Sequence, residues 1–323
     1  MSLSLTPDQV EQFRREGYLL VKGLLNPAED LDPVYHEYAG VLDDLAKLLY
    51  DKGEISSTYA DLPFSQRLIQ IYKESGKVQQ QYFDFTLHGA AVAEDTAFWV
   101  GPEVFHLLRN ARLLDAVESL IGPEIYSNPV QHVRLKPPEQ FTPRDAEGRL
   151  QLGKTPPHQD NGVVTPDADE TEMLTVWFPL WDATVENGCL MVWPNSKHEG
   201  LQPHCPAFDG LQIPIKMVHG QPLSMPMQRG DVLFLHRLTL HASHANLSEH
   251  VRWSFDLRYN PIGQPTGRGH FPGFVARSRQ HPETELRDPA EWARLWYDTR
   301  HRLAHRETEP SFNRWSADSP VCA

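Results

Sequence analysis

A histidine and an aspartate two positions apart, His158 and Asp160 in the run Pro157-His158-Gln159-Asp160, are the residues best placed to do chemistry. On an extended strand side chains alternate between faces, so both can present a ligand atom to one metal ion. No other His-x-Asp triplet exists, and His281-Pro282-Glu283 and His305-Arg306-Glu307 fall outside the predicted strands. Taken alone, the triplet also fits a structural histidine beside a surface aspartate.

A third metal ligand is needed, because two histidines and one carboxylate form the facial triad of non-haem Fe(II) oxygenases. His236, His241 and His244 all lie at or after the end of one predicted strand, and their spacing does not choose among them. Arg252 favours His241, because it lies eleven residues further along the chain. A turn would bring the two onto adjacent antiparallel strands, where a guanidinium can bind the far carboxylate of 2-oxoglutarate.

These residues belong to a longer pattern that resembles the phytanoyl-CoA dioxygenase family of Fe(II)- and 2-oxoglutarate-dependent oxygenases. The similarity runs from about Leu5 to about Pro261. In chain order, its motifs are Lys136-Pro137-Pro138, His158-Gln159-Asp160, Trp177 followed by Glu186 to Val192, Pro194 to His198, and Gly230-Asp231 leading to His241-Ala242-Ser243, Asn246, Ser248 and Arg252. The motif from Pro194 to His198 has one residue more than the family's Pro-Gly-Ser/Thr-His, so His198 is assigned no role in the site.

The resemblance implies a double-stranded β-helix, or jelly roll, in which three side chains hold iron: His158, Asp160 and His241. It also implies that Arg252 and Ser243 bind the far carboxylate of 2-oxoglutarate.

The same resemblance implies that Trp177 and His132 line the 2-oxoglutarate pocket. Without it, Trp177 fits a core tryptophan and His132 a hydrogen-bonded strand histidine. Gln131 and Arg258 are further candidates for the wall of a substrate cavity, and Cys189 fits a small buried residue.

The elements that must position these residues predict one α+β domain over 1–323 with a mainly β core. Apolar residues at three- and four-residue steps predict helices, and short β-branched and aromatic runs predict strands. The predicted helices cover about 7–17, 26–53, 102–121 and 289–305, and the strands 18–21, 125–135, 173–180, 190–193, 231–235 and 252–259. We therefore expect a helical part to about 122, a β-helix core over about 123–262, and a C-terminal helix and tail over 263–323. Loops 137–157 and 202–228 are expected on the rim of a site.

Composition limits the possible partners and the compartment. The 323 residues carry a formal net charge of −13, which disfavours a protein that neutralises nucleic-acid phosphates. Three cysteines, Cys189, Cys205 and Cys322, are too few and too irregular for a disulfide framework. With no secretory signal and no apolar run near membrane-spanning length, we expect a cytoplasmic protein that uses no membrane. The oligomeric state is not predicted.

The expected activity is oxidation of a small-molecule metabolite, most simply hydroxylation of an unactivated C–H bond, with release of succinate and carbon dioxide. Fe(II), 2-oxoglutarate and dioxygen are the expected cofactors and cosubstrates, with ascorbate as an auxiliary reductant. An intact Asp160 favours hydroxylation, because related halogenases have Gly or Ala at that position. Two alternatives stay open: a non-catalytic binding protein on the same fold, and a cupin-like metalloenzyme that uses no 2-oxoglutarate.

Overall fold

The computed structural model describes residues 4–87, 92–208, 210–306 and 314–322. Its helices flank a block of strands, as the sequence predicts. The helices are α1 (Pro7–Glu16), α2 (Asp32–Asp51), α3 (Phe64–Ser75), α4 (Pro102–Leu108), α5 (Ala111–Ile121) and α6 (Pro289–Ala304). The strands are β1 (Tyr18–Val21), β2 (Glu124–Lys136), β3 (Leu174–Pro179), β4 (Leu190–Val192), β5 (Cys205–Ala207), β6 (Gly210–Gln212), β7 (Leu223–Met225), β8 (Val232–His236), β9 (His241–Ser243), β10 (Arg252–Pro261) and β11 (Phe274–Ser278).

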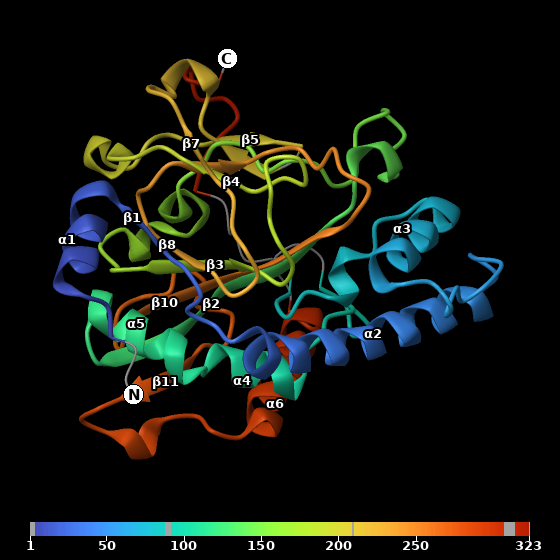
Figure 1. The fold of residues 1–323 in the computed structure, drawn as a ribbon, viewed down its shortest axis with the longest axis horizontal. Coiled ribbons are helices and arrows are strands. Elements are labelled where there is room, and N and C mark those ends of the chain that lie inside the picture. The colour runs from blue at the N-terminus through green and yellow to red at the C-terminus, as the bar shows by residue number, and fades with distance from the viewer. Residues whose placement is uncertain (1–3, 88–91, 209, 307–313, 323) are drawn as a thin grey trace.

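Two antiparallel sheets and a hairpin make up the β part. The major sheet has the order β1-β8-β3-β10-β2-β11, the minor sheet β7-β4-β9, and β5 pairs with β6. Helices lie below the major sheet and the minor sheet lies above it (Figure 1). The predicted class, α+β with a mainly β core wrapped by helices, is confirmed in this arrangement.

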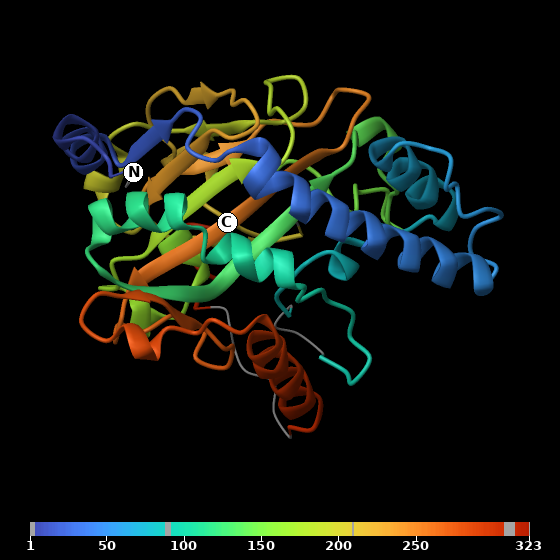
Figure 2. The ribbon, with the colours of Figure 1, turned by 60° about the horizontal axis from the view of Figure 1, so that its bottom comes forward.

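The side chains of β10 alternate between the hydrophobic core on one face of the major sheet and the site on the other face. Trp253, Phe255 and Tyr259 are fully buried and face the helices, where the Trp253 ring stacks on Phe64 with centroids 4.7 Å apart. Burial of such rings is a major source of stability, because each removes a large apolar area from water. Figure 2 shows the helices crossing this face of the sheet. The alternate residues of β10, from Arg252 to Arg258, point to the opposite face.

Local sequence explains where two of the helices begin. The Thr6 hydroxyl accepts from the Gln9 amide, and the Gln9 side chain accepts from the Thr6 amide, which is a capping box. The single helix predicted over 102–121 is wrong, because the structure breaks it into α4 and α5. The Asn110 side-chain oxygen accepts from the amides of Arg112 and Leu113 and so starts a new helix.

The cysteines differ from the expectation. Cys205 and Cys322 form a disulfide across 117 residues, while Cys189 is free and buried. Irregular spacing concealed this pair, because it forms only when the C-terminal tail folds back onto β5.

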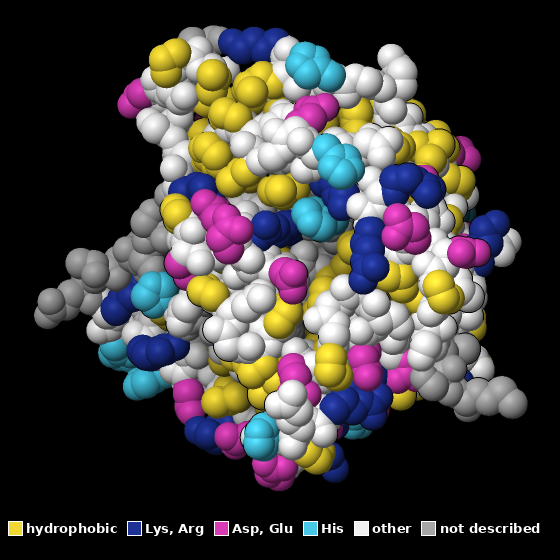
Figure 3. Space-filling view, turned by 90° about the vertical axis from the view of Figure 1, so that its left-hand side faces the viewer, with side chains coloured by type: hydrophobic (Ala, Val, Ile, Leu, Met, Phe, Trp, Pro, Cys, Tyr) yellow, Lys and Arg dark blue, Asp and Glu magenta, His cyan; other side chains and the backbone are white. Residues whose placement is uncertain are grey.

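No helix in the described part of the chain is long and apolar enough to cross a membrane. On the face drawn in Figure 3, Lys and Arg side chains are interspersed with Asp and Glu and form no continuous basic field.

Candidate metal centre

The inner face of the major sheet brings polar residues from three strands into register. Asp256 of β10 pairs with Trp177 of β3 on one side and His132 of β2 on the other, and Arg258 pairs with Thr175. These five residues line one cavity of about 200 Å³. The site therefore lies between the two sheets.

His158, Asp160 and His241 are buried and come together at this cavity, with one ligand atom from each lying within 4.8 Å of the others. His158 and His241 exchange two backbone hydrogen bonds of 3.0 Å, and their rings lie 4.2 Å apart. The His241 Nε2 lies 4.0 Å from the Asp160 Oδ1. Backbone pairing therefore holds the segment that carries His158 and Asp160 beside His241, which is distant in sequence.

Both histidines are oriented for metal binding by their own backbone. The Nδ1 atoms donate to carbonyls two residues earlier, His158 to Pro156 at 2.9 Å and His241 to Thr239 at 3.0 Å. This leaves each Nε2 with a lone pair, as ligation requires. Burial holds the pKa of His158 well below its ordinary value, so that ring is neutral. The donor set fits a divalent transition metal.

Asp160 is kept ionised by its neighbours. Its Oδ1 accepts from Arg258 and its Oδ2 from the Thr175 hydroxyl. Burial alone would raise the pKa of Asp160, but the Arg258 guanidinium holds it below its ordinary value. Arg258 therefore orients the carboxylate that would bind the metal.

Arg252 is a buried cation in the same cavity with no carboxylate within 4 Å among the described residues. Its Nη1 donates to Ser254 at 3.1 Å, its guanidinium lies 5.5 Å from the Trp177 ring centre, and its Nε has no hydrogen-bond partner. Burial and the nearby charge of Arg134 lower the pKa of Arg252 to about 10. An unpaired buried guanidinium of this kind is suited to bind a carboxylate.

The other predicted cosubstrate residues take different positions. Ser243 does not line the cavity, because its hydroxyl accepts from Lys136 Nζ at 3.0 Å and from the Thr155 amide at 2.8 Å. Trp177 and His132 do line it, and His132 Nδ1 lies 2.8 Å from the buried Asp84 carboxylate.

The alternative third ligands are directed elsewhere. His236 accepts from the Leu238 amide and faces a separate pocket beside Phe13. His244 pairs with Ser224 at 2.9 Å. His198, which was given no role, is hydrogen-bonded to the Arg15 carbonyl. Within the described residues, the other group with convergent ligand atoms, Glu94, His301 and His305, is exposed.

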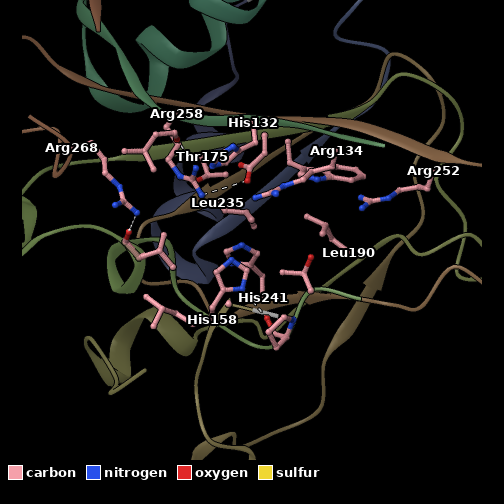
Figure 4. A pocket seen from close by; sticks show the side chains of 18 residues that line it. His132, Arg134, His158, Thr175, Leu190, Leu235, His241, Arg252, Arg258 and Arg268 are labelled. Atoms are coloured by element: carbon pink, nitrogen blue, oxygen red, sulfur yellow. Dashed lines mark hydrogen bonds and ion pairs between the residues drawn. The ribbon is translucent and has the colours of Figure 1, made fainter. Parts of the chain in front are cut away.

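Arginines lie on both sides of the histidine pair (Figure 4). Arg252 and Arg134 lie on one side of His158 and His241, and Arg258 and Arg268 on the other. Gln131, a second candidate for the cavity wall, is buried but absent from the lining, whereas Arg258 contributes to it.

Four residues important to the site were not predicted from the sequence: Thr175, Lys136, Arg134 and Arg268. Lys136 belongs to a recognised motif, yet only the fold shows that it contacts Ser243. Arg134 and Thr175 could have been found from alternation along their strands, once the inner face was known.

Two imidazoles and a carboxylate that converge in a buried cavity, with an unpaired arginine nearby, define a mononuclear metal site of the two-histidine, one-carboxylate class. The model of the phytanoyl-CoA dioxygenase (PhyH) family matches residues 13–254. The chain belongs to this family.

Relatives agree with this membership. Phytanoyl-CoA dioxygenase domain-containing protein 1 of Danio rerio is 26% identical over 77% of this chain and 87% of its own length. The peroxisomal phytanoyl-CoA dioxygenase of Bos taurus is 26% identical over 88% of this chain and 75% of its own.

Solved structures share the fold. The apo non-heme monooxygenase ThoJ has a TM-score of 0.56 at 17% identity, over 91% of this chain and 98% of its own. The epimerase SnoN in complex with Fe3+, alpha ketoglutarate and nogalamycin RO has a TM-score of 0.51 at 21% identity, over 80% and 86%.

Proposed function

We propose that this protein is an Fe(II)- and 2-oxoglutarate-dependent dioxygenase that hydroxylates an unactivated C–H bond of a small-molecule metabolite. The observation that carries the proposal is the buried Arg252, which forms no ion pair among the described residues and lines the same cavity as His158 and His241, the histidines whose ligand atoms converge with that of Asp160. A metalloenzyme that used no dicarboxylate cosubstrate would have no need for this buried cation. Family membership and the SnoN complex support the same assignment.

The chain's own residues would hold the metal and orient its ligands. The Nε2 atoms of His158 and His241 and the Asp160 carboxylate would coordinate iron, and three positions would stay open for cosubstrate and dioxygen. Arg258 and the Thr175 hydroxyl keep that carboxylate ionised and correctly aimed. When bound, iron supplies the redox chemistry that the side chains lack.

The cosubstrate would lie between the metal ligands and Arg252. The guanidinium would bind its far carboxylate, with Trp177 against one side. His132, held by Asp84, lines the same cavity, whereas the Ser243 hydroxyl is engaged by Lys136 and does not line it.

Succinate formation tests the proposal against both alternatives. Protein purified without oxygen is supplied with Fe(II), 2-oxoglutarate and ascorbate, and succinate is followed on admitting air with a panel of small metabolites. We expect succinate from the wild type and from Asp44→Ala, an exposed control, but not from Asp160→Ala. Arg252→Gln should need more 2-oxoglutarate, and Arg294→Gln is its exposed control.

Two results would contradict the proposal. Wild-type succinate no higher than that of Asp160→Ala across the panel indicates a binding protein. Oxidation of a substrate at an equal rate without 2-oxoglutarate indicates a cupin-like enzyme.

We also propose the cytosol as the compartment. Cytosolic thiols are normally kept reduced, so Cys205 and Cys322 should be alkylated when cells are lysed directly into a denaturant that contains the thiol reagent, which exposes the buried Cys205. If both cysteines are instead protected at steady state, the protein functions in an oxidising compartment.

A further inference from the structure

The C-terminal tail, residues 314–322, lies behind the segment that carries two of the metal ligands. Trp315 Nε1 donates to the Gly162 carbonyl at 2.6 Å, and the indole stacks on His204 with centroids 5.4 Å apart. Arg314 forms an ion pair with Asp169, one contact of which is 2.9 Å. Figure 1 shows this tail ending beside β5 and β7, on the side of the minor sheet.

The ligand segment has a second face that packs against other parts of the protein. His158 and Asp160 face the cavity, whereas Gln159 between them is fully buried on the opposite side. The Gln159 amide donates to His204 Nε2 at 2.9 Å, and its side chain donates to the carbonyls of Gly200 and Leu238 at 2.8 Å each.

The next residue on this second face is also connected to the tail. The Asn161 side chain donates to Asp169 Oδ1 at 3.3 Å, and Asp169 is the ion-pair partner of Arg314. Gly162 fits tightly, since a Cβ there would lie 2.0 Å from the His204 ring. His204 and Asp169 therefore support the backbone around Asp160 on the side away from the cavity, and the tail contacts both of them directly.

A disulfide fixes the far end of the tail. Cys322 is bonded to Cys205 at the start of β5, the residue after His204. Strand β5 pairs with β6, and Gly210 and Leu211 of β6 line the cavity. One covalent bond thus joins the tail to both the support behind the ligands and one wall of the pocket.

We propose that Trp315 is a positioning residue for the metal ligands His158 and Asp160, and that the Cys205–Cys322 disulfide controls this support by its redox state. The inference rests on the proposed function and adds a means of regulating the same site. A dithiol reductant would break the sulfur–sulfur bond. Cys205 and Cys322 take up two electrons and two protons from the dithiol and become two thiols, while the dithiol is oxidised to a cyclic disulfide. The tail then keeps its Arg314 and Trp315 contacts but loses its covalent link to β5.

The test measures metal affinity and local exchange on the full-length chain, with Co(II) as the probe. Co(II) binding is followed by its visible absorption, and hydrogen exchange is followed in the peptide that contains the Gln159 amide. The disulfide is opened with a phosphine, which supplies the same two electrons and takes an oxygen atom from water to become the phosphine oxide; both are removed by desalting without oxygen before titration. Variants are Trp315→Ala, Trp315→Phe and Cys322→Ser. Trp99→Phe is the matched control, because it loses an indole hydrogen bond to Glu37 away from the site.

Reduction and Cys322→Ser should each raise the Co(II) dissociation constant about tenfold, the lower end of the effect of removing outer-shell support. Both should speed exchange at Gln159, and Cys322→Ser should no longer respond to the phosphine. Trp315→Ala should act in the same direction, Trp315→Phe should retain part of the affinity by keeping the stack, and Trp99→Phe should have no effect.

Unchanged Co(II) affinity and Gln159 exchange after reduction would overturn the proposal. Faster exchange throughout the chain with no selective change at Gln159 would also overturn it, because the tail would then be a general stabiliser. If wild type forms no succinate while Co(II) affinity still responds to reduction, the proposed activity fails and the positioning role stands.

Discussion

Replacing Arg258 tests whether this guanidinium is needed for stability as long as its buried partner Asp160 is charged. Arg258 is 3% exposed and Asp160 0% exposed, and the guanidinium also donates to the Val130 carbonyl. Arg258→Met keeps most of the volume and leaves Asp160 as a buried charge without its counter-ion. Removing one partner of such a pair costs about 3–5 kcal/mol. We expect a loss of this size in the unfolding free energy of the metal-free protein.

Urea unfolding followed by circular dichroism measures this loss in a double-mutant cycle with Asp160→Asn. Asparagine has the same shape as aspartate without the charge. The unfolding free energy of the double variant should therefore exceed that of Arg258→Met alone by at least about 2 kcal/mol. Arg294→Met is the matched control, because Arg294 pairs with Glu291 and Asp298 on an exposed helix face, and its replacement should leave the unfolding free energy almost unchanged. The reasoning is refuted if Arg258→Met costs no more than the control, or if the costs of Arg258→Met and Asp160→Asn simply add.

Three further outcomes are expected. Arg252→Gln should raise the KM for 2-oxoglutarate about 10- to 100-fold, since a charge-assisted hydrogen bond contributes roughly 1.5–3 kcal/mol; an unchanged KM from succinate assays would place the cosubstrate elsewhere. His241→Ala should abolish tight Co(II) binding while His244→Ala leaves it intact, and calorimetric titration showing the reverse would reassign the third ligand. Burial lowers the pKa of His204 to about 4. Between about pH 6.5 and 4 the unfolded chain therefore binds more protons than the folded protein. The unfolding free energy falls by roughly 3 kcal/mol as the pH is lowered through this window. Urea unfolding at several pH values should show a flatter dependence for His204→Gln, and equal slopes would count against this.

Strands rich in apolar and β-branched residues were predictable from the sequence. The predicted runs 125–135, 173–180, 190–193 and 252–259 match β2, β3, β4 and β10 to within two residues at each end. Strand β9 was not predicted, because its three residues are a strand only through pairing with β4. Helix α3 has a clear apolar face that was not singled out, and the break between α4 and α5 depends on one asparagine side chain.

The site was predictable where chemistry has a local spacing. Two-residue alternation and an arginine on a neighbouring predicted strand made His158, Asp160 and Arg252 candidates, and the resemblance to the family selected them. The interactions of Arg258 with Asp160 and of Trp315 with Gly162 span 98 and 153 residues, and no local pattern encodes either one. The disulfide was concealed for the same reason.

Three histidines share one local arrangement: in His158, His204 and His241 the Nδ1 donates to the carbonyl two residues earlier. Each ring is thus aimed by its own short stretch of backbone, independently of the metal and of the other rings. Folding has only to bring pre-aimed rings to the correct separation, and the backbone pairing of His158 with His241 does this. The direction of the ligand atoms and the distance between them are therefore separate properties of this molecule. A designer could move the three-residue histidine units to another sheet and retain the direction of the ligand atoms. Only the distance between them would have to be rebuilt.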